Sequence, residues 1–154
     1  FDWGCMQLEG NIPLQWVPEG VRKVVLSGNA LTGTLDLASL PASFEELECP
    51  MNQLTGELLL GNLPDGMLNL HAEHNSLSGS LNLTELPPSM AQLILNDNLF
   101  SGEINITMLP QSLKIFILNK NGLSGSLVFR NLPPAMDSES ESDLGKTLSK
   151  VRLT

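Results

Sequence analysis

The stretch "LNDNLFSGEINITMLPQS", residues 95–112, decides the fold, because the chain returns to its pattern at a fixed interval. Residues 72–89 read "AEHNSLSGSLNLTELPPS", and residues 49–66 read "CPMNQLTGELLLGNLPDG". Asn98, Gly102 and Pro110 therefore recur every 23 residues. Self-similarity at a period of about 20–50 residues is the signature of repeat proteins, whose stacked units share one continuous core. The repeat consequently governs every expectation about this structure.

Five complete 23-residue repeats fill the middle of the chain. They begin at Val21, Phe44, Met67, Met90 and Leu113. The asparagine column consists of Asn29, Asn52, Asn75, Asn98 and Asn121. An asparagine amide both donates and accepts hydrogen bonds, glycine permits positive φ or close backbone approach, and proline suits a position that needs no backbone N–H. These three columns are predicted to be scaffold rather than chemistry.

Each repeat is predicted to form one coil with a strand on one side. Apolar residues alternate at period 2 before the asparagine, as in Leu47 and Cys49, which indicates a strand with one buried face. A second alternating pair follows the glycine, as in Leu58 and Leu60, and predicts a shorter extended piece. One repeat cannot bury enough apolar surface to offset the entropy of ordering its backbone, so neighbouring coils must stack.

The chain is predicted to be a single domain, residues 1–154, with four parts. Residues 1–20 form a partial repeat, residues 21–135 the five repeats, residues 136–147 an acidic, serine-rich insertion and residues 148–154 a terminal strand. Both ends stop inside a repeat without a recognisable cap. Because solenoids need polar caps to stay soluble, open ends predict that copies of the chain could form a homo-oligomer.

Charge is distributed unevenly along the chain, whose formal net charge is −9. Ten acidic residues and no Lys or Arg lie between Lys23 and Lys114. A middle this acidic repels phosphate groups, which argues against nucleic acid and anionic membrane surfaces as partners. No apolar run reaches the roughly 18 residues that a membrane-spanning helix needs, so no membrane insertion is predicted.

The repeats resemble those of the leucine-rich repeat family. The segment "LPQSLKIFILNKNGL" fits the pattern L-x-x-L-x-L-x-x-N-x-L, and "LPPSMAQLILNDNLFSGEINITMLPQSL" is similar to the 23-residue repeats of kinetoplastid protozoan leucine-rich repeat proteins. The resemblance covers essentially the whole chain. It implies a right-handed solenoid, of the α/β class by convention but mostly β, with a parallel sheet on its concave face. It also implies short extended segments or turns on the convex side, little or no helix, and a protein-binding role.

The concave face is predicted to consist of the side chains that point outward along the first strand of each repeat. Parallel stacking places the same column of adjacent repeats side by side, so Glu48 is expected beside His71. His74 is expected beside Asp97 for the same reason, and Ile94 and Ile117 should form a small apolar spot. This surface suits a basic or mixed-charge protein segment. The predicted partner-binding residues are Glu46, Glu48, His71, Glu73, His74, Ile94, Asp97, Ile117 and Lys120.

The sequence predicts no catalytic residue, no metal site and no cofactor. The imidazoles and carboxylates of the concave face lack a recognised ligand spacing, and no nucleophile–base–orienter arrangement appears. Cys49 stands in a buried column, and Cys5 lies two repeats away, beyond the reach of a disulfide. The protein is therefore predicted not to be an enzyme.

Two glycosylation sequons occur in one outward-facing column, at Asn82 and Asn105. These asparagines would be accessible acceptors if the chain were secreted. The content of Asn, Ser and Thr alone predicts about two sequons by chance, so they give no argument for secretion. The family resemblance favours an extracellular or cell-surface location, whereas the residues themselves decide no compartment.

Two functions remain open on these grounds. The first is a protein-interaction or ligand-recognition scaffold that binds a protein or peptide through the concave face. The alternative is a structural, self-assembling repeat protein that associates through the ends of the solenoid. The molar mass in solution, measured across concentrations, discriminates between them.

Overall fold

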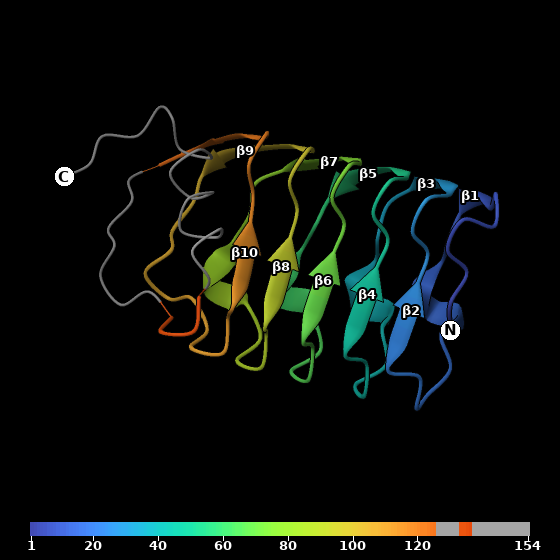
Figure 1. Ribbon diagram of the computed structural model, residues 1–154, viewed down its shortest axis with the longest axis horizontal. Coiled ribbons are helices and arrows are strands. Elements are labelled where there is room, and N and C mark those ends of the chain that lie inside the picture. Colours follow the sequence, from blue (N-terminus) through green and yellow to red (C-terminus); the bar gives the residue numbers. More distant parts are fainter. Residues whose placement is uncertain (126–132, 137–154) are drawn as a thin grey trace.

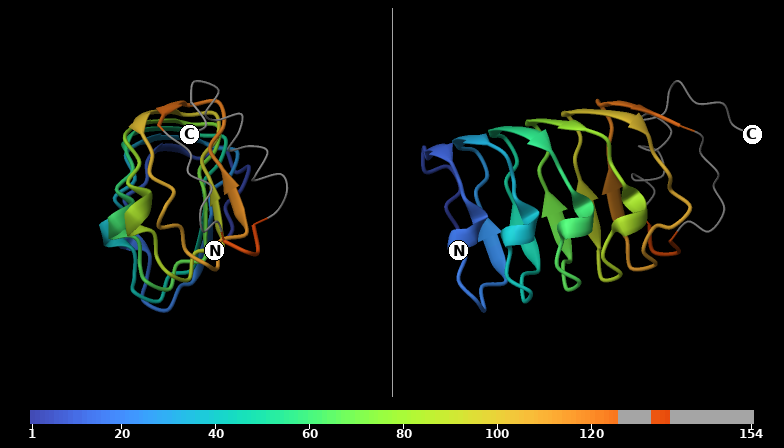
Figure 2. Two further views of the ribbon diagram at one scale, coloured as in Figure 1. Left: turned by 90° about the vertical axis from the view of Figure 1, so that its left-hand side faces the viewer. Right: turned by 180° about the vertical axis from the view of Figure 1, so that it is seen from behind.

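The chain winds into stacked coils, as the repeat predicts. The computed structural model describes residues 1–125 and 133–136. Figure 1 shows the coils side by side along the long axis, and the left view of Figure 2 shows them nearly superimposed. Strands of consecutive coils pair with an offset of 23 residues in one sheet, as in Leu47 opposite Leu70, and of 21 residues in the other, as in Thr32 opposite Gln53. The predicted insertion (136–147) and terminal strand (148–154) lie outside the described residues, apart from Met136.

A five-stranded parallel sheet forms one side of the coils and carries the concave face (Figure 1). Its strands are β2 (Lys23–Val25), β4 (Glu46–Glu48), β6 (Asn69–His71), β8 (Gln92–Ile94) and β10 (Ile115–Ile117). In every strand the middle residue is buried and its two neighbours face outward. The predicted solenoid with a parallel sheet is thereby confirmed.

A six-stranded parallel sheet follows the upper edge of the coils in Figure 1. Its strands are β1 (Glu9–Asn11), β3 (Ala30–Gly33), β5 (Gln53–Glu57), β7 (Ser76–Gly79), β9 (Leu99–Glu103) and β11 (Gly122–Ser124). The sequence placed the second extended piece after the glycine, but in β3, β5, β7 and β9 the paired strand begins before the glycine and includes it. Only glycine fits this position readily: at Gly56, within β5, φ is +82°, and a Cβ atom would lie 2.6 Å from Thr34 Cγ2.

Short 3-10 turns occupy the side of the coils opposite the five-stranded sheet (Figure 2). They are η1 (Leu14–Trp16), η2 (Leu37–Ser39), η3 (Leu60–Asn62) and η4 (Leu83–Glu85). Asp36 and Asn82 begin two of these turns, and their side-chain oxygens accept hydrogen bonds from the backbone N–H two residues later. Residues 1–125 and 133–136 contain no α-helix, in agreement with the predicted convex side.

The asparagine column forms a continuous hydrogen-bonded ladder inside the coils. Asn98 Nδ2 donates to the carbonyl oxygen of Leu95 in its own coil at 3.1 Å and to that of Ala72 in the preceding coil at 3.0 Å. Its Oδ1 accepts from the backbone N–H of Leu77 at 3.0 Å. Asn52, Asn75 and Asn121 repeat this arrangement. The ladder supplies hydrogen bonds to buried backbone groups where the chain bends between its two sheets.

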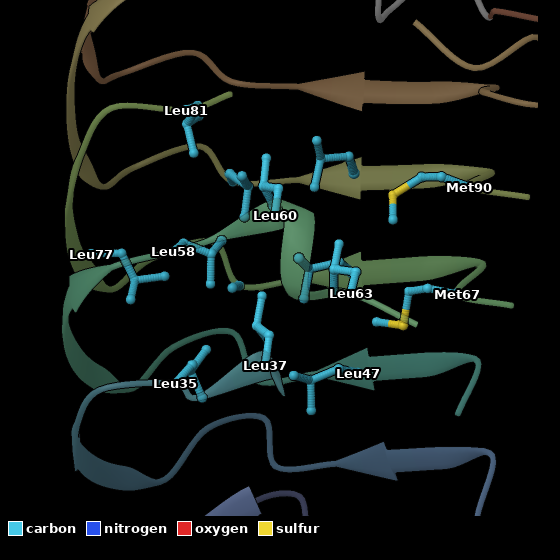
Figure 3. Close-up of a cluster of buried hydrophobic side chains, with 14 of the residues drawn as sticks. Leu35, Leu37, Leu47, Leu58, Leu60, Leu63, Met67, Leu77, Leu81 and Met90 are labelled. Atoms are coloured by element: carbon cyan, nitrogen blue, oxygen red, sulfur yellow. The ribbon is translucent and has the colours of Figure 1, made fainter. Parts of the chain in front are cut away.

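The core fills the space between the two sheets and the 3-10 turns. Figure 3 shows Leu47 and Met67, which enter from the five-stranded side, together with Leu58 and Leu77 from the opposite side. Phe100 is fully buried in the column that lies two residues after each ladder asparagine, where other coils have leucine, as at Leu54 and Leu77. Every coil contributes apolar side chains to this one interior, so the solenoid has a single continuous core.

The residue before each ladder asparagine adopts the left-handed conformation. These residues are Gly28, Met51, His74, Asp97 and Lys120, with φ between +53° and +65°, and Cys5 has the same conformation one coil earlier, before Met6. An L side chain in this region costs roughly 1–2 kcal/mol, and only glycine avoids the cost. The backbone geometry that the asparagine ladder requires is therefore imposed on side chains of no common chemistry.

Replacing Met51 with glycine is expected to raise the free energy of unfolding by up to about 1 kcal/mol, because the relief of left-handed strain exceeds the entropy that glycine adds to the unfolded chain. Urea unfolding measures the difference. Met6→Gly is a matched control, since Met6 is similarly exposed, at 58 % against 57 %, and has no positive φ. Equal losses of stability in both variants would contradict the strain argument.

Candidate functional site

The concave face brings the predicted binding residues together in the expected columns. Glu48 lies opposite His71, His71 opposite Ile94, and Ile94 opposite Ile117. These four side chains are partly exposed, because each occupies an outward position beside a buried strand residue. The row therefore changes from acidic through imidazole to apolar along the solenoid axis. The predicted neighbours are confirmed, including the adjacent isoleucines.

The hydrogen bond of His71 differs from the one that its acidic neighbour suggested. A ring nitrogen, Nε2, lies 2.9 Å from Gln92 Oε1 in the next coil. The sequence named Glu48 as the neighbour of His71, and the strand register agrees, but the imidazole bonds to the amide instead. Gln92 was absent from the predicted binding residues, although it has an outward position in β8, the strand that carries Ile94, and this position could have identified it.

The acidic residues of β4 are already paired with a lysine of β2. Lys23 Nζ lies 2.6 Å from Glu48 Oε1 and 3.0 Å from Glu46 Oε2. The hydrogen bonds that Lys23 donates to Glu48 and Glu46 raise the pKa of Lys23 above its ordinary value, so the lysine stays charged. The acidic appearance of this region in the sequence therefore overstates the charge that the surface offers to a partner.

A second charged group surrounds Asp97 beyond the C-terminal end of β8. Lys120 Nζ lies 3.0 Å from one carboxylate oxygen, and His74 Nδ1 lies 3.7 Å from the other. Asn96 Nδ2 donates a hydrogen bond of 2.8 Å to the latter oxygen. Partial burial alone would raise the pKa of Asp97, but the hydrogen bonds from Asn96 and Lys120, with the charges of Lys120 and His74, lower it overall.

Asp97→Asn is expected to destabilise the protein at pH 7 and to do so progressively less as the pH falls below about 4, the ordinary pKa of aspartate. The folded-state pKa is lowered, so the carboxylate stabilises the folded protein above the unfolded-state pKa and loses this effect on protonation. Urea unfolding from pH 7 to about pH 2 tests the trend. Lys120→Met should reproduce it, because that variant removes the same pair. A difference that is constant with pH would contradict this assignment.

Two acceptor oxygens on the concave face lack a hydrogen-bond partner among the described residues. They are Asn69 Oδ1 and Glu73 Oε2, both on or just after β6. Glu73 is also the one carboxylate of the predicted binding residues for which the described part of the chain supplies no ion pair. Both atoms are buried, so their missing donors cost stability, and the atoms themselves offer no exposed acceptor to a partner.

The two cysteines occupy different environments, as expected. Cys49 is fully buried behind β4, and burial, followed by the charge of Glu73, raises the pKa of its thiol to about 12. Cys5 is exposed, and both thiols are free. A buried thiol with so high a pKa remains protonated and acts as a small core residue.

Both predicted glycosylation acceptors are exposed on the convex side. Asn82 Oδ1 accepts from the hydroxyl of Thr84 at 2.7 Å, and Asn105 Oδ1 accepts from that of Thr107 at 2.6 Å. Each asparagine thereby holds its sequon in a tight turn.

The described residues bring together no group of three or more His, Cys, Asp or Glu side chains that could hold a metal ion. Within the same part of the chain, no helix has the length and apolar character needed to cross a membrane. Neither a protein-family model nor a curated protein sequence matches the chain.

Solved structures of plant receptors are similar to this chain. The plant peptide hormone receptor RGFR1 in complex with RGF2 matches with 25 % identity and a TM-score of 0.70, over 83 % of this chain and 21 % of its own. The Arabidopsis receptor kinase HAESA ectodomain, in complex with an IDA peptide hormone ligand, has 26 % identity and a TM-score of 0.70, over 79 % of this chain and 21 % of its own.

A shorter plant ectodomain shows the same likeness over more of its own length. The receptor kinase SOBIR1 from Arabidopsis thaliana has 26 % identity and a TM-score of 0.69, and the match covers 80 % of this chain and 70 % of that ectodomain. The chain spans about a fifth of the RGFR1 and HAESA chains that it matches. With the coil geometry and the asparagine ladder, these likenesses support a leucine-rich repeat fold, a solenoid similar to segments of plant receptor ectodomains.

Proposed function

We propose that the protein binds an extended segment of another protein or a peptide through the concave face. The observation that carries this proposal is the partly exposed pair Ile94 and Ile117, which continues the outward row of Glu48 and His71 across the sheet. An apolar contact flanked by polar groups is typical of a recognition surface. The RGFR1 and HAESA structures, which contain RGF2 and an IDA peptide, support a peptide as the partner.

The partner is proposed to carry a basic residue close to an apolar one. Lys23 and Lys120 already neutralise part of the acidic surface, so a strongly basic partner would gain less than the sequence suggests. Glu73 forms no ion pair within the described part of the chain, so it is the carboxylate proposed to meet a lysine or arginine of the partner. The proposal is for binding rather than catalysis, and for a protein or peptide rather than nucleic acid.

Selection from a displayed random-peptide library tests the proposal directly. Peptides that bind the wild-type protein are expected to lose at least about tenfold in affinity for Ile94→Asp, the loss typical of a central apolar contact. Leu99→Asp is the matched control, because Leu99 is exposed on β9 of the other sheet. Selected peptides that bind both variants as well as wild type would contradict concave-face recognition.

An extracellular or cell-surface location is proposed with this function, since the similar plant structures are receptor ectodomains. Asn82 and Asn105 are then proposed as glycan acceptors. Intact mass before and after glycosidase treatment of protein secreted from eukaryotic cells tests both positions, with Asn82→Gln and Asn105→Gln as controls. The similarity of the 23-residue repeats to those of kinetoplastid protozoan leucine-rich repeat proteins is likewise a proposal.

Self-association through the solenoid ends is the second candidate. Phe1, which is 55 % exposed, stacks on Trp3 with ring centroids 5.2 Å apart. The ring centroids of Trp3 and Trp16 lie 4.9 Å apart. An aromatic cluster at the N-terminal coil supports association at this end. Light scattering across a range of concentrations is expected to give a rising mass if copies associate there, and Phe1→Ser should abolish the rise. A constant monomer mass of 16.7 kDa would exclude it.

A further inference from the structure

A hollow of about 230 Å³ lies between two consecutive coils on the convex side, away from the concave face. Residues 57–62 of one coil line it, and Ser80, Asn82 and Glu85 of the next coil complete its wall. We call it the flank hollow. Its lining combines carboxylates, neutral polar groups and leucine, and none of these residues belongs to the proposed binding surface.

Two glycines leave room for the carboxylate side chains that border the flank hollow. Glu57 reaches toward the next coil over Gly79, where a Cβ atom would lie 2.8 Å from Glu57 Cγ. Glu85 reaches back toward the preceding coil over Gly61, where a Cβ atom would collide with its Oε2. The two side chains thus cross the same boundary between coils from opposite directions, and both line one hollow.

Neither Glu57 nor Glu85 forms an ion pair with any residue of the described part of the chain. This contrasts with the concave face, where Glu46 and Glu48 share Lys23. The chain carries no Lys or Arg between positions 23 and 114, so the surrounding coils contain no nearby cation of this type. The flank hollow therefore presents negative charge that is free to meet a cation from outside.

Leu59 supplies an exposed apolar rim at a position where neighbouring repeats carry a polar cap. Asp36 and Asn82 occupy the equivalent positions and accept a backbone hydrogen bond at the start of their turns. Leu59 forms no such bond and is 59 % exposed. Its neighbours Leu58 and Leu60 point into the core (Figure 3), so the core does not require a third leucine here. Folding alone would favour Asp or Asn at this position.

We infer that the flank hollow is a second docking point, which receives an arginine side chain of a partner protein. The guanidinium group would lie between Glu57 and Glu85, since its planar donors suit two carboxylates, while its methylene stem would cover Leu59. Asn82 would add an amide acceptor at the edge. This contact uses a different surface from the concave face and does not depend on the proposed function.

A titration followed by NMR tests this inference, with the blocked tripeptide acetyl-Gly-Arg-Gly-amide as the probe and unglycosylated protein as the target. Saturable shifts are expected at the backbone amides of Gly61 and Gly79. The same tripeptide with citrulline, the neutral isostere of arginine, should bind at least about fivefold more weakly, as the loss of ion pairs requires. Equal binding of the two probes, or shifts confined to the concave face, would overturn the inference.

Three variants separate docking from folding. Glu57→Gln with Glu85→Gln is expected to weaken arginine-peptide binding at least about fivefold, whereas Glu103→Gln, an exposed acid two coils away in the column of Glu57, should leave it unchanged. Leu59→Asn should raise the melting temperature by about 2–4 °C through a new cap and still weaken binding. Unchanged arginine-peptide binding in Leu59→Asn and in the double variant would overturn the inference. The library-peptide test with Ile94→Asp addresses only the concave face, so its failure would leave the flank hollow unaffected.

Discussion

Asn98→Ala is expected to lower the free energy of unfolding by at least about 3 kcal/mol, because three buried backbone groups lose their partners and each costs about 1–3 kcal/mol. These groups are the N–H of Leu77 and the carbonyls of Ala72 and Leu95. Asn98 is only 6 % exposed, so water cannot readily replace the amide. Urea unfolding, monitored by far-ultraviolet circular dichroism, measures the loss.

Two further variants make the Asn98 prediction specific. Asn62→Ala changes the same residue type at an exposed position and should alter stability by less than about 0.5 kcal/mol. Asn98→Asp keeps one acceptor oxygen but places the other against two carbonyl oxygens, so it should be at least as damaging as alanine at neutral pH. If Asn98→Ala proves as mild as Asn62→Ala, the ladder does not hold the coils together.

Phe100→Ala is expected to destabilise the protein by about 3–5 kcal/mol, the usual cost of a cavity left by a fully buried phenylalanine. Phe100 has no exposed surface, whereas the adjacent Leu99 on the same strand is 63 % exposed. Leu99→Ala should therefore change stability by less than about 0.5 kcal/mol. Chemical unfolding of the two variants compares neighbouring residues that differ mainly in burial.

Phe100→Leu gives the intermediate case. Leucine is the residue of this column in other coils, as at Leu54 and Leu77, so the interior accommodates its shape. A cost below about 1.5 kcal/mol is expected for this replacement. A loss as large as that of Phe100→Ala would show that the ring fills a space that leucine cannot, and that the coils are less equivalent than their common period indicates.

The buried half of the fold could be predicted from the sequence because burial is what the repeat encodes. Leu47 and Cys49 alternate as a strand requires, and both are fully buried. The asparagine column could be assigned to hydrogen bonding with the backbone from its chemistry, since the short asparagine side chain carries both an amide donor and a carbonyl acceptor. Strand register followed from the constant period, which is why Glu48 and His71 were expected as neighbours.

The exposed half was predicted less well, for physical reasons. Lys23 reaches diagonally across the strands to Glu48, and a long flexible side chain leaves no periodic trace of its partner. The left-handed column contains Met51 and Lys120, which share no property that a pattern could reveal. The second strand begins before its glycine and includes it, as β5 includes Gly56, because backbone pairing, rather than side-chain alternation, defines the strand. Pairing between surface side chains therefore depends on conformations that the repeat pattern does not encode.

The asparagine ladder has a consequence for cooperativity, because each amide bonds backward to the coil before it. Asn75 holds the carbonyl of Cys49, and Asn98 holds that of Ala72, so every coil is completed by the one that follows. Unfolding of one coil removes partners from its predecessor, and opening should spread along the axis in nearest-neighbour steps. A whole period can be removed or duplicated in such a chain, since the newly adjacent coils recreate the same bonds. The length of the solenoid is thus a variable that evolution can change in units of one coil.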